Sequence, residues 1–150
     1  MPDLLSPQPA AAAGFEQYIR EYSGGVLALS SILLGKGSEA ERVTAGTFNK
    51  LYEPYCKGKL KAADFPVEAY RECILQCTKS AKSRNLRTSK ELSWDDQLVK
   101  ALWYGLLLPL PEIGKILGKS LPALKAQLRQ VREHTAGQKP LRSQANLSIV

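Results

Sequence analysis

Few of the residues that carry enzyme chemistry occur in this sequence of 150 residues. It has one histidine, His134, three cysteines and one methionine. General acid–base catalysis draws most often on histidine, and no pattern of acids accompanies His134. Gly105, Gly114 and Gly118 stand at helix ends or inside helical patterns, and no Gly-Lys-Ser/Thr follows a strand, which excludes nucleotide hydrolysis at a phosphate loop. The sequence predicts a protein that is not an enzyme and that binds no cofactor.

Long apolar runs are also absent. The longest, residues 26–34 and 101–110, are interrupted by serine, glycine or proline, and a membrane-spanning helix needs about 18 to 20 apolar residues. We therefore expect no membrane insertion. Residues 1–14 have no basic start ahead of an apolar stretch, so they do not resemble a secretory signal. A cytoplasmic protein with reduced thiols is the expectation.

The three cysteines do not make up a metal site by their spacing. Cys73 and Cys77 are one helical turn apart, and Cys56 could fold near them. A structural zinc ion needs four ligands, and only His134, in the other half of the chain, could complete the set. Because Cys77 has the phase of an inward-facing residue, we expect buried, apolar thiols and no bound metal.

Acidic residues are outnumbered by basic ones. The sequence has 14 Asp and Glu against 21 Lys and Arg, a formal net charge of +7, and its pI is near 9.4. Such an excess favours a polyanionic partner, nucleic acid above all. The apolar share of 44% and the charged share of 23% are ordinary for a folded, soluble chain, so disorder throughout is excluded.

Helical periodicity dominates the first half of the chain. The first helix is predicted to start near Phe15, to kink at Gly24 and Gly25, and to stop at Gly35 and Gly37. Its apolar stripe comprises Phe15, Tyr18, Ile19, Tyr22, Val26, Leu29, Ile32 and Leu33.

A second helix is predicted from Ser38, read as an N-cap with Glu41 three residues on, to Leu51 or Tyr52, with Pro54 ending it. Its inward residues are Ala40, Val43, Thr47, Phe48 and Leu51. After an exposed loop over residues 56–63, a third helix starts at about Pro66, with Val67, Tyr70, Ile74, Cys77 and Ala81 inward. It runs into five basic residues that no acid interrupts, namely Lys79, Lys82, Arg84, Arg87 and Lys90.

The second half has the pattern of a helix-turn-helix. Ser93, with Asp96 three residues on, is the predicted cap of a helix that Gly105 closes. Pro111 suits the first position of the next helix, which ends before Gly118. A turn of about four residues then leads into a helix with the stripe Leu121, Leu124, Leu128 and Val131.

The predicted fold is all-α, with two small helical domains joined by a short linker. The expected units are a flexible leader at 1–14, a domain of three to four helices at 15–84, a linker at 85–92, a helix-turn-helix domain at 93–135 and a disordered tail at 136–150.

The second helix of a helix-turn-helix enters the DNA major groove, which assigns roles to its residues. Ser120, Pro122, Ala123 and Lys125 form its N-terminal face; Lys119, Arg129 and Arg132 can meet phosphates; Gln127 and Gln130 can read base edges, adenine by preference. The basic run adds Lys79, Lys82 and Arg84 as further candidates for DNA contact. A plain helical hairpin and a solvated helix end remain the alternatives.

Both halves, in this order, resemble the extracytoplasmic-function (ECF) group of bacterial sigma factors. The stretch LGKGSEAERVTAGTF at 34–48 is similar, without a gap, to the family pattern of leucine-glycine, polar residues, aspartate-alanine-glutamate-aspartate, then glutamine-glutamate-threonine-phenylalanine. Residues 103–118 and the stretch LKAQLRQVRE at 124–133 resemble the helix-turn-helix of sigma domain four. The likeness spans roughly residues 15–133.

The resemblance implies binding to core RNA polymerase, recognition of promoter DNA by both domains, and an anti-sigma factor as a possible further partner. By position, it assigns Glu39, Glu41, Thr47 and Phe48 to the polymerase-binding helix. It assigns Tyr70, Arg71, Lys79, Lys82 and Arg84 to the helix that meets the upstream edge of the melted promoter, and residues 120–132 to the distal element.

Departures from the family pattern keep two other interpretations open. Arg42, Ala45 and Gly46 replace acids and a glutamine, and Glu68 stands where the family commonly has tryptophan. The alternatives are a degenerate sigma-like adaptor, co-sigma subunit or decoy that does not melt promoters, and a stand-alone helix-turn-helix regulator.

Overall fold

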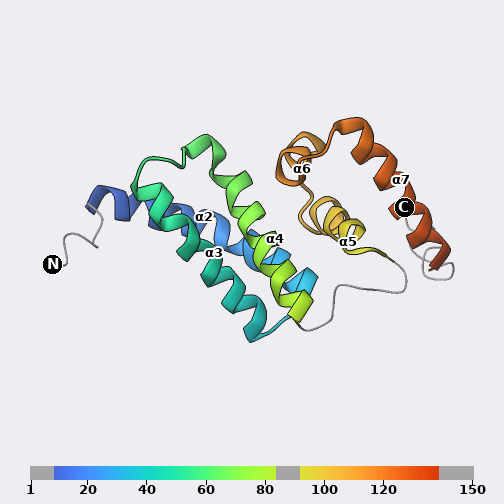
Figure 1. The fold of residues 1–150 in the computed structure, drawn as a ribbon, viewed down its shortest axis with the longest axis horizontal. Coiled ribbons are helices and arrows are strands. Elements are labelled where there is room, and N and C mark those ends of the chain that lie inside the picture. Colours follow the sequence, from blue (N-terminus) through green and yellow to red (C-terminus); the bar gives the residue numbers. More distant parts are fainter. Residues whose placement is uncertain (1–8, 84–91, 139–150) are drawn as a thin grey trace, which may run out of the picture.

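A computed structural model describes residues 9–83 and 92–138. Every regular element within them is helical, so the all-α prediction is confirmed. The elements are α2 (Pro9–Leu34), α3 (Ser38–Cys56), a 3₁₀ turn η1 (Ala62–Asp64), α4 (Phe65–Ser83), α5 (Trp94–Lys100), a π-helical turn η2 (Ala101–Gly105), α6 (Leu110–Leu117) and α7 (Leu121–Gln138). Figure 1 shows α2, α3 and α4 in one half and α5, α6 and α7 in the other.

Helix α2 begins earlier than the apolar stripe predicts. Its first residue is Pro9, because proline suits a helix start and the alanines that follow are the strongest helix formers. Part of the predicted flexible leader is therefore helical, and residues 1–8 lie outside the described part of the chain. The helix continues through Gly24 and Gly25, and it ends at Leu34, before Gly35 with a φ of 92°.

Helix α3 differs from the prediction at both ends. Gly37, with a φ of 140°, takes the N-cap position without a side-chain hydrogen bond, and Ser38 is the first helical residue. The helix passes through Pro54 and ends at Cys56. Its last turns are held by aromatic packing, since Phe15 has ring centroids 4.9 Å from Tyr52 and 5.2 Å from Tyr55. The five predicted inward residues are all buried: Ala40, Val43, Thr47, Phe48 and Leu51.

Phe65 is the centre of the three-helix half. It is fully buried at the start of α4, and its ring stacks on Tyr18 with centroids 4.3 Å apart. Tyr22 and Phe15 add ring contacts at 5.7 and 5.9 Å. Of the predicted inward residues of α4, Tyr70, Cys77 and Ala81 are buried, and Val67 and Ile74 are half-buried. Arg84 and most of the predicted linker, residues 85–91, lie outside the described ranges.

The cap of α5 and the turn after α6 agree with the sequence prediction. The Ser93 Oγ accepts a hydrogen bond of 3.0 Å from the Asp96 N–H, and Gly118 ends α6 with a φ of 68°. Pro109 takes the N-cap position of α6, so Pro111 is the second helical residue and not the first. Helix α7 runs to Gln138, which makes 136–138 helical where a tail is predicted; residues 139–150 lie outside the description.

The two halves share one core, which the prediction of two small domains did not include. Buried residues from α2, α3 and α4 form a single cluster with those of α5, η2, α6 and α7. Helix α2 packs against η2, and α4 packs against α6. Trp94 Nε1 donates a hydrogen bond of 3.0 Å to Thr78 Oγ1 across this boundary. Ile32 Cδ1 lies 2.5 Å from where a Cβ on Gly105 would stand, so the bare glycine makes room for it.

A double-mutant cycle across this boundary is expected to show coupling. Trp94→Phe and Thr78→Val each remove one end of the hydrogen bond, so we expect a coupling of about 1 kcal/mol in the free energy of unfolding measured in urea. Thr44→Val is the matched control. Thr44 Oγ1 on α3 donates to the carbonyl four residues back, as Thr78 Oγ1 does on α4, but it makes no hydrogen bond to Trp94. Additive effects for Trp94 and Thr78 would contradict a shared boundary.

Candidate nucleic-acid interface

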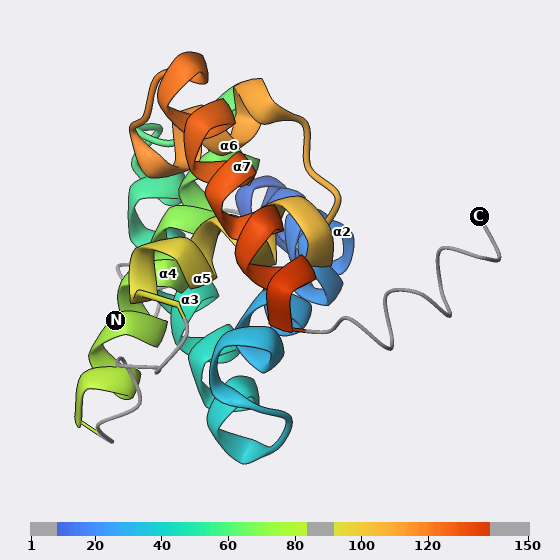
Figure 2. The ribbon, with the colours of Figure 1, turned by 90° about the vertical axis from the view of Figure 1, so that its right-hand side faces the viewer.

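Helices α6 and α7 form the predicted helix-turn-helix, joined by a tight turn over residues 118–120. A Cβ on Gly114 would lie 2.8 Å from the Lys119 carbonyl oxygen, so only glycine allows the turn to lie this close to α6. Helix α7 buries Leu124, Leu128 and Val131, at spacings of four and three residues, against the rest of the half. Figure 2, which views the protein from the side of this half, shows α7 on its outside.

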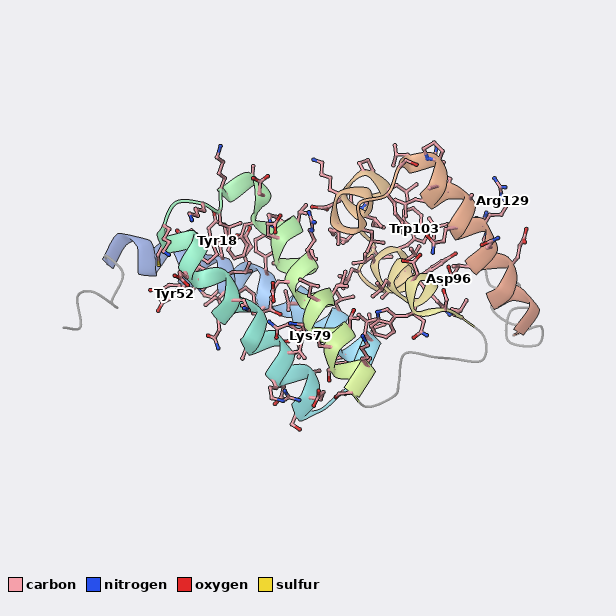
Figure 3. All side chains as sticks on the ribbon, in the orientation of Figure 1. Tyr18, Tyr52, Lys79, Asp96, Trp103 and Arg129 are labelled. Carbon is pink, nitrogen blue, oxygen red and sulfur yellow. The ribbon has the colours of Figure 1, made fainter. Side chains whose placement is uncertain are left out.

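The outward surface of α7 carries most of the predicted DNA-binding residues. Exposed are Ser120, Pro122, Ala123, Lys125, Arg129, Gln130 and Arg132. The three cations follow one another at four and three residues and therefore lie along one side of the helix. In Figure 3 the Arg129 side chain points away from α5 and α6. Within the described residues none of these three cations forms an ion pair.

Lys119 and Gln127 are placed differently from the prediction. Lys119 Nζ lies 2.9 Å from Asp95 Oδ2, and Gln127 Nε2 donates to Asp95 Oδ2 at 2.8 Å and to Asp96 Oδ1 at 2.7 Å. Both side chains are thus held by acids at the start of α5, and Figure 3 shows Asp96 on that helix, facing α7. Sequence periodicity could not reveal these contacts, because they join helices more than 20 residues apart.

The ionisation of Asp95 reflects these contacts. Its partial burial alone would raise the pKa, but hydrogen bonds from Lys119 and Gln127 together with the Lys119 charge hold the pKa below its usual range. A lowered pKa in the folded protein means that the contact is present above the ordinary value of about 3.9 and is lost as the pH falls through the folded-state pKa. The contact is therefore fully formed at neutral pH.

Helix α4 presents a second basic surface. Lys79 and Lys82 are exposed, and so are Arg71 and Leu75, at spacings that place all four along one side of the helix. Tyr70, which the family resemblance assigns to promoter contact, is instead buried, with its hydroxyl against Gly25 of α2. The described part of α4 therefore offers its cations to solvent but not this tyrosine.

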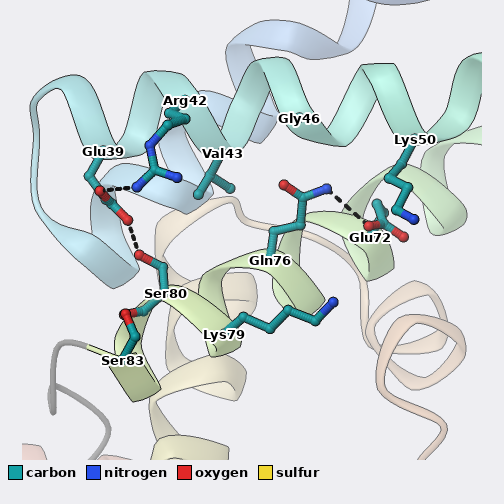
Figure 4. Close-up of a pocket in the computed structure, with 10 residues that line it drawn as sticks. All are labelled: Glu39, Arg42, Val43, Gly46, Lys50, Glu72, Gln76, Lys79, Ser80 and Ser83. Atoms are coloured by element: carbon teal, nitrogen blue, oxygen red, sulfur yellow. Dashed lines mark hydrogen bonds and ion pairs between the residues drawn. The ribbon is translucent and has the colours of Figure 1, made fainter.

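A polar groove of about 510 Å³ lies between α3 and α4 (Figure 4). Within it Gln76 donates to Glu72 at 3.0 Å, while Glu39 accepts from Arg42 and from Ser80. A Cβ on residue 46 would lie 2.5 Å from Gln76 Oε1. Gly46, which departs from the family pattern, therefore leaves the space into which Gln76 packs. Most polar groups of the groove are already satisfied by one another.

A second hollow, of about 340 Å³, lies between α2 and α3. We call it the α2–α3 groove; its lining residues are Ile19, Ser23, Leu27, Glu41, Thr44, Ala45, Phe48 and Asn49. Leu27 is 38% exposed although it is apolar, and Glu41 at the rim is exposed. Neither Ile19 nor Leu27 was predicted as a site residue from the sequence. The available signal was Leu27, a large apolar residue outside the apolar stripe of the helix.

The four predicted polymerase-contacting residues do not form one surface. Thr47 is fully buried and its Oγ1 donates to the Val43 carbonyl at 2.8 Å, so it cannot reach a partner. Phe48 is buried in the core and touches the floor of the α2–α3 groove. Glu41 lies at the rim of that groove, whereas Glu39 lies in the polar groove on the other side of α3. Helical periodicity had already predicted Thr47 and Phe48 as inward, and the structure agrees with it.

The structure also bears on the three thiols and on the expected absence of a membrane-spanning helix. Cys73 and Cys77 are fully buried, as the phase of Cys77 predicts, and Cys56 is exposed at the end of α3. The hydrogen bond with Cys77, together with burial, raises the pKa of Cys73. Within residues 9–83 and 92–138 no three His, Cys, Asp or Glu side chains gather as metal ligands. None of the described helices combines the length and apolarity that crossing a membrane requires.

Comparison with known proteins adds no relative: neither a family model nor a curated protein sequence matches this chain. The geometry of the helix-turn-helix and of the two grooves is therefore the basis for a functional proposal.

Proposed function

We propose that the protein is a divergent ECF-type sigma factor, a cytoplasmic, non-enzymatic protein that binds core RNA polymerase and recognises promoter DNA. The observation that carries the proposal is the exposed row of Lys125, Arg129 and Arg132 on the second helix of the helix-turn-helix. Cations that form no ion pair within residues 9–83 and 92–138 are free to contact phosphates, and their place on this helix is the one that such contacts require beside a major groove. Lys79 and Lys82 on α4 supply a second basic surface in the other half.

The α2–α3 groove is the proposed polymerase-binding surface. Its apolar lining, with Leu27 and Ala45 exposed and Glu41 at the rim, fits an amphipathic helix with basic residues along its edge. Helix α3, one of its two walls, is the helix to which the family resemblance assigns polymerase binding. An anti-sigma factor that occludes polymerase binding would compete for the same groove.

A second candidate function is supported by Gly46 and its neighbours. In a sigma-like adaptor, co-sigma subunit or decoy, the chain binds polymerase or an anti-sigma factor and does not open DNA. Arg42, Ala45 and Gly46 depart from the family pattern on one helix, and Gln76 has taken the place of a side chain at position 46. A gain in initiation after Ala45→Gln and Gly46→Glu would support this function, and the collision with Gln76 involves only the end of a flexible side chain.

Titration of the labelled full chain with core RNA polymerase, in competition with the main sigma factor of the host, tests the proposal. Abortive transcription on a fragment library then separates the candidates. Binding with initiation supports a sigma factor, and binding without initiation supports the adaptor. Absence of binding would overturn the sigma factor and the polymerase-binding form of the adaptor, and would favour a stand-alone helix-turn-helix regulator, which would bind a two-fold symmetric duplex without polymerase.

Leu27→Asp is expected to weaken the complex with core polymerase by about tenfold or more in the same titration without DNA. The added carboxylate would be desolvated in an apolar contact, which costs more than 1 kcal/mol. Leu75→Asp is the matched control, because Leu75 is an exposed leucine on α4 away from the groove. Equal losses for both variants, or no loss for Leu27→Asp, would place the polymerase contact elsewhere.

A further inference from the structure

The start of α5 and the helix-turn-helix meet in a compact set of polar contacts. Asp95 Oδ2 receives Lys119 Nζ at 2.9 Å and Gln127 Nε2 at 2.8 Å. Asp96 Oδ1 receives Gln127 Nε2 at 2.7 Å. We call these four residues the acid clamp. Two carboxylates thus hold Lys119 of the turn and Gln127 of α7.

The acid clamp occupies the hydrogen-bonding groups that DNA would need. Gln127 has two N–H donors on its amide nitrogen, and Asp95 and Asp96 take both. A glutamine reads adenine by donating one of these N–H groups while accepting at its oxygen, so a held Gln127 cannot do so. Lys119 likewise has its charge balanced by Asp95, whereas Lys125, Arg129 and Arg132 form no ion pair among the described residues.

The groups of the acid clamp are fixed in place before any partner arrives. Ser93 caps α5 and accepts from the Asp96 N–H, which sets the direction of the first turn. Gly114 and the left-handed Gly118 hold the Lys119 backbone close to α6. The Lys119 side chain is 27% exposed and that of Asp95 is 54% exposed, so the ion pair is reachable from solvent. A pair of this exposure contributes little stability and can be exchanged for another anion.

We propose that Asp95 and Asp96 are an internal competitor for DNA: their carboxylates hold the Lys119 ammonium and the Gln127 amide in the free protein, and DNA must displace them to gain these two contacts. The inference rests on the proposed DNA binding of α7. The consequence is regulatory. The acids lower the affinity for every duplex, and a duplex whose bases hydrogen-bond the released Gln127 amide offsets this loss and is favoured over the others. The acid clamp thus sets a threshold that separates specific from non-specific binding.

The salt dependence of duplex binding distinguishes competition from a merely structural contact. Each phosphate contact adds about 0.9 to the slope of log affinity against log salt. On a duplex of random sequence nothing compensates for the loss of the acid contacts, so Lys119 stays paired with Asp95 in the complex and Lys119→Ala alone is expected to leave the slope unchanged. Asp95→Asn keeps the shape and frees the ammonium, so it is expected to steepen the slope by about 0.9 and to raise affinity at low salt by about fivefold.

The experiment measures binding of the full chain to a fluorescent duplex of random sequence, by anisotropy, over a series of NaCl concentrations. The variants are Asp95→Asn, Lys119→Ala, the combination of both, and Asp96→Asn. The combined variant is expected to lose the gain of Asp95→Asn, because the freed ammonium is gone. Asp64→Asn, an exposed acid in the other half, is the control for net charge and is expected to change affinity by less than a factor of about two.

The outcomes distinguish failure of the proposed competition from failure of the proposed DNA binding. Suppose that the wild type binds duplex and Asp95→Asn binds it with equal or lower affinity, or that Lys119→Ala alone lowers the slope. Either result would overturn the proposed competition and make the acid clamp a positioning device. A gain in Asp95→Asn that survives Lys119→Ala would also overturn it, since the gain would then be general charge. If no variant, the wild type included, binds duplex at any salt, the proposed DNA binding fails and the inference fails with it.

Discussion

Arg129→Glu combined with Arg132→Glu is expected to weaken duplex binding by about 100-fold or more at low salt. Both side chains are exposed along one side of α7 and form no ion pair in the described part of the chain. If each meets a phosphate, the slope of log affinity against log salt should become shallower by about 1.8. Anisotropy of a labelled duplex over a salt series measures both effects.

The control for this double variant is a second pair of charge reversals far from α7. Lys59→Glu with Lys61→Glu changes the net charge by the same amount, and both lysines are exposed between α3 and α4. A local interface predicts a large loss for the arginine pair and a small one for the lysine pair. Equal losses would show that only the overall charge matters, and the helix-turn-helix would no longer be the DNA-binding element.

Phe65→Ala is expected to lower the free energy of unfolding by about 3–5 kcal/mol, the cost of emptying a fully buried aromatic site. Phe65 has no exposed surface, and its ring contacts come from α2 and α3. Urea unfolding followed by circular dichroism measures the change. Phe65→Leu, which refills most of the volume, is expected to cost less.

The same variant tests the shared core. Both tryptophans, Trp94 and Trp103, lie in the other half, so tryptophan fluorescence follows the unfolding of that half. One core predicts that Phe65→Ala moves the fluorescence transition together with the circular dichroism transition. A fluorescence transition that stays in place while circular dichroism shifts would show two independently stable halves.

Helix periodicity predicted the elements well where burial within one helix decides the result. All five predicted inward residues of α3 are buried. Of the predicted α7 stripe, Leu124, Leu128 and Val131 are buried, whereas Leu121, in the first turn, is 41% exposed and the prediction for it is wrong. The side-chain cap at Ser93 was also predicted correctly, whereas the cap predicted at Ser38 was wrong, because Gly37 takes that position. The features that were predicted correctly require only the geometry of a single helix, which the sequence pattern contains.

Helix ends were predicted less well, because packing and propensity compete there. Pro54 does not stop α3, since Tyr52 and Tyr55 pack on Phe15 and hold the turns around the proline. The start of α2 at Pro9 has the opposite cause, a run of alanines that favours helix without any apolar stripe.

The sequence by itself determined that the protein is helical, that α6 and α7 form a helix-turn-helix, and that the charge of the chain is strongly positive. Only the tertiary structure decided which of the predicted site residues are available. It buries Thr47 and Tyr70, it ties Gln127 and Lys119 to Asp95, and it joins both halves in one core. The physical reason is the range of the interactions: periodicity and caps act within a few residues, whereas these contacts join helices that are distant in the chain and meet only after folding.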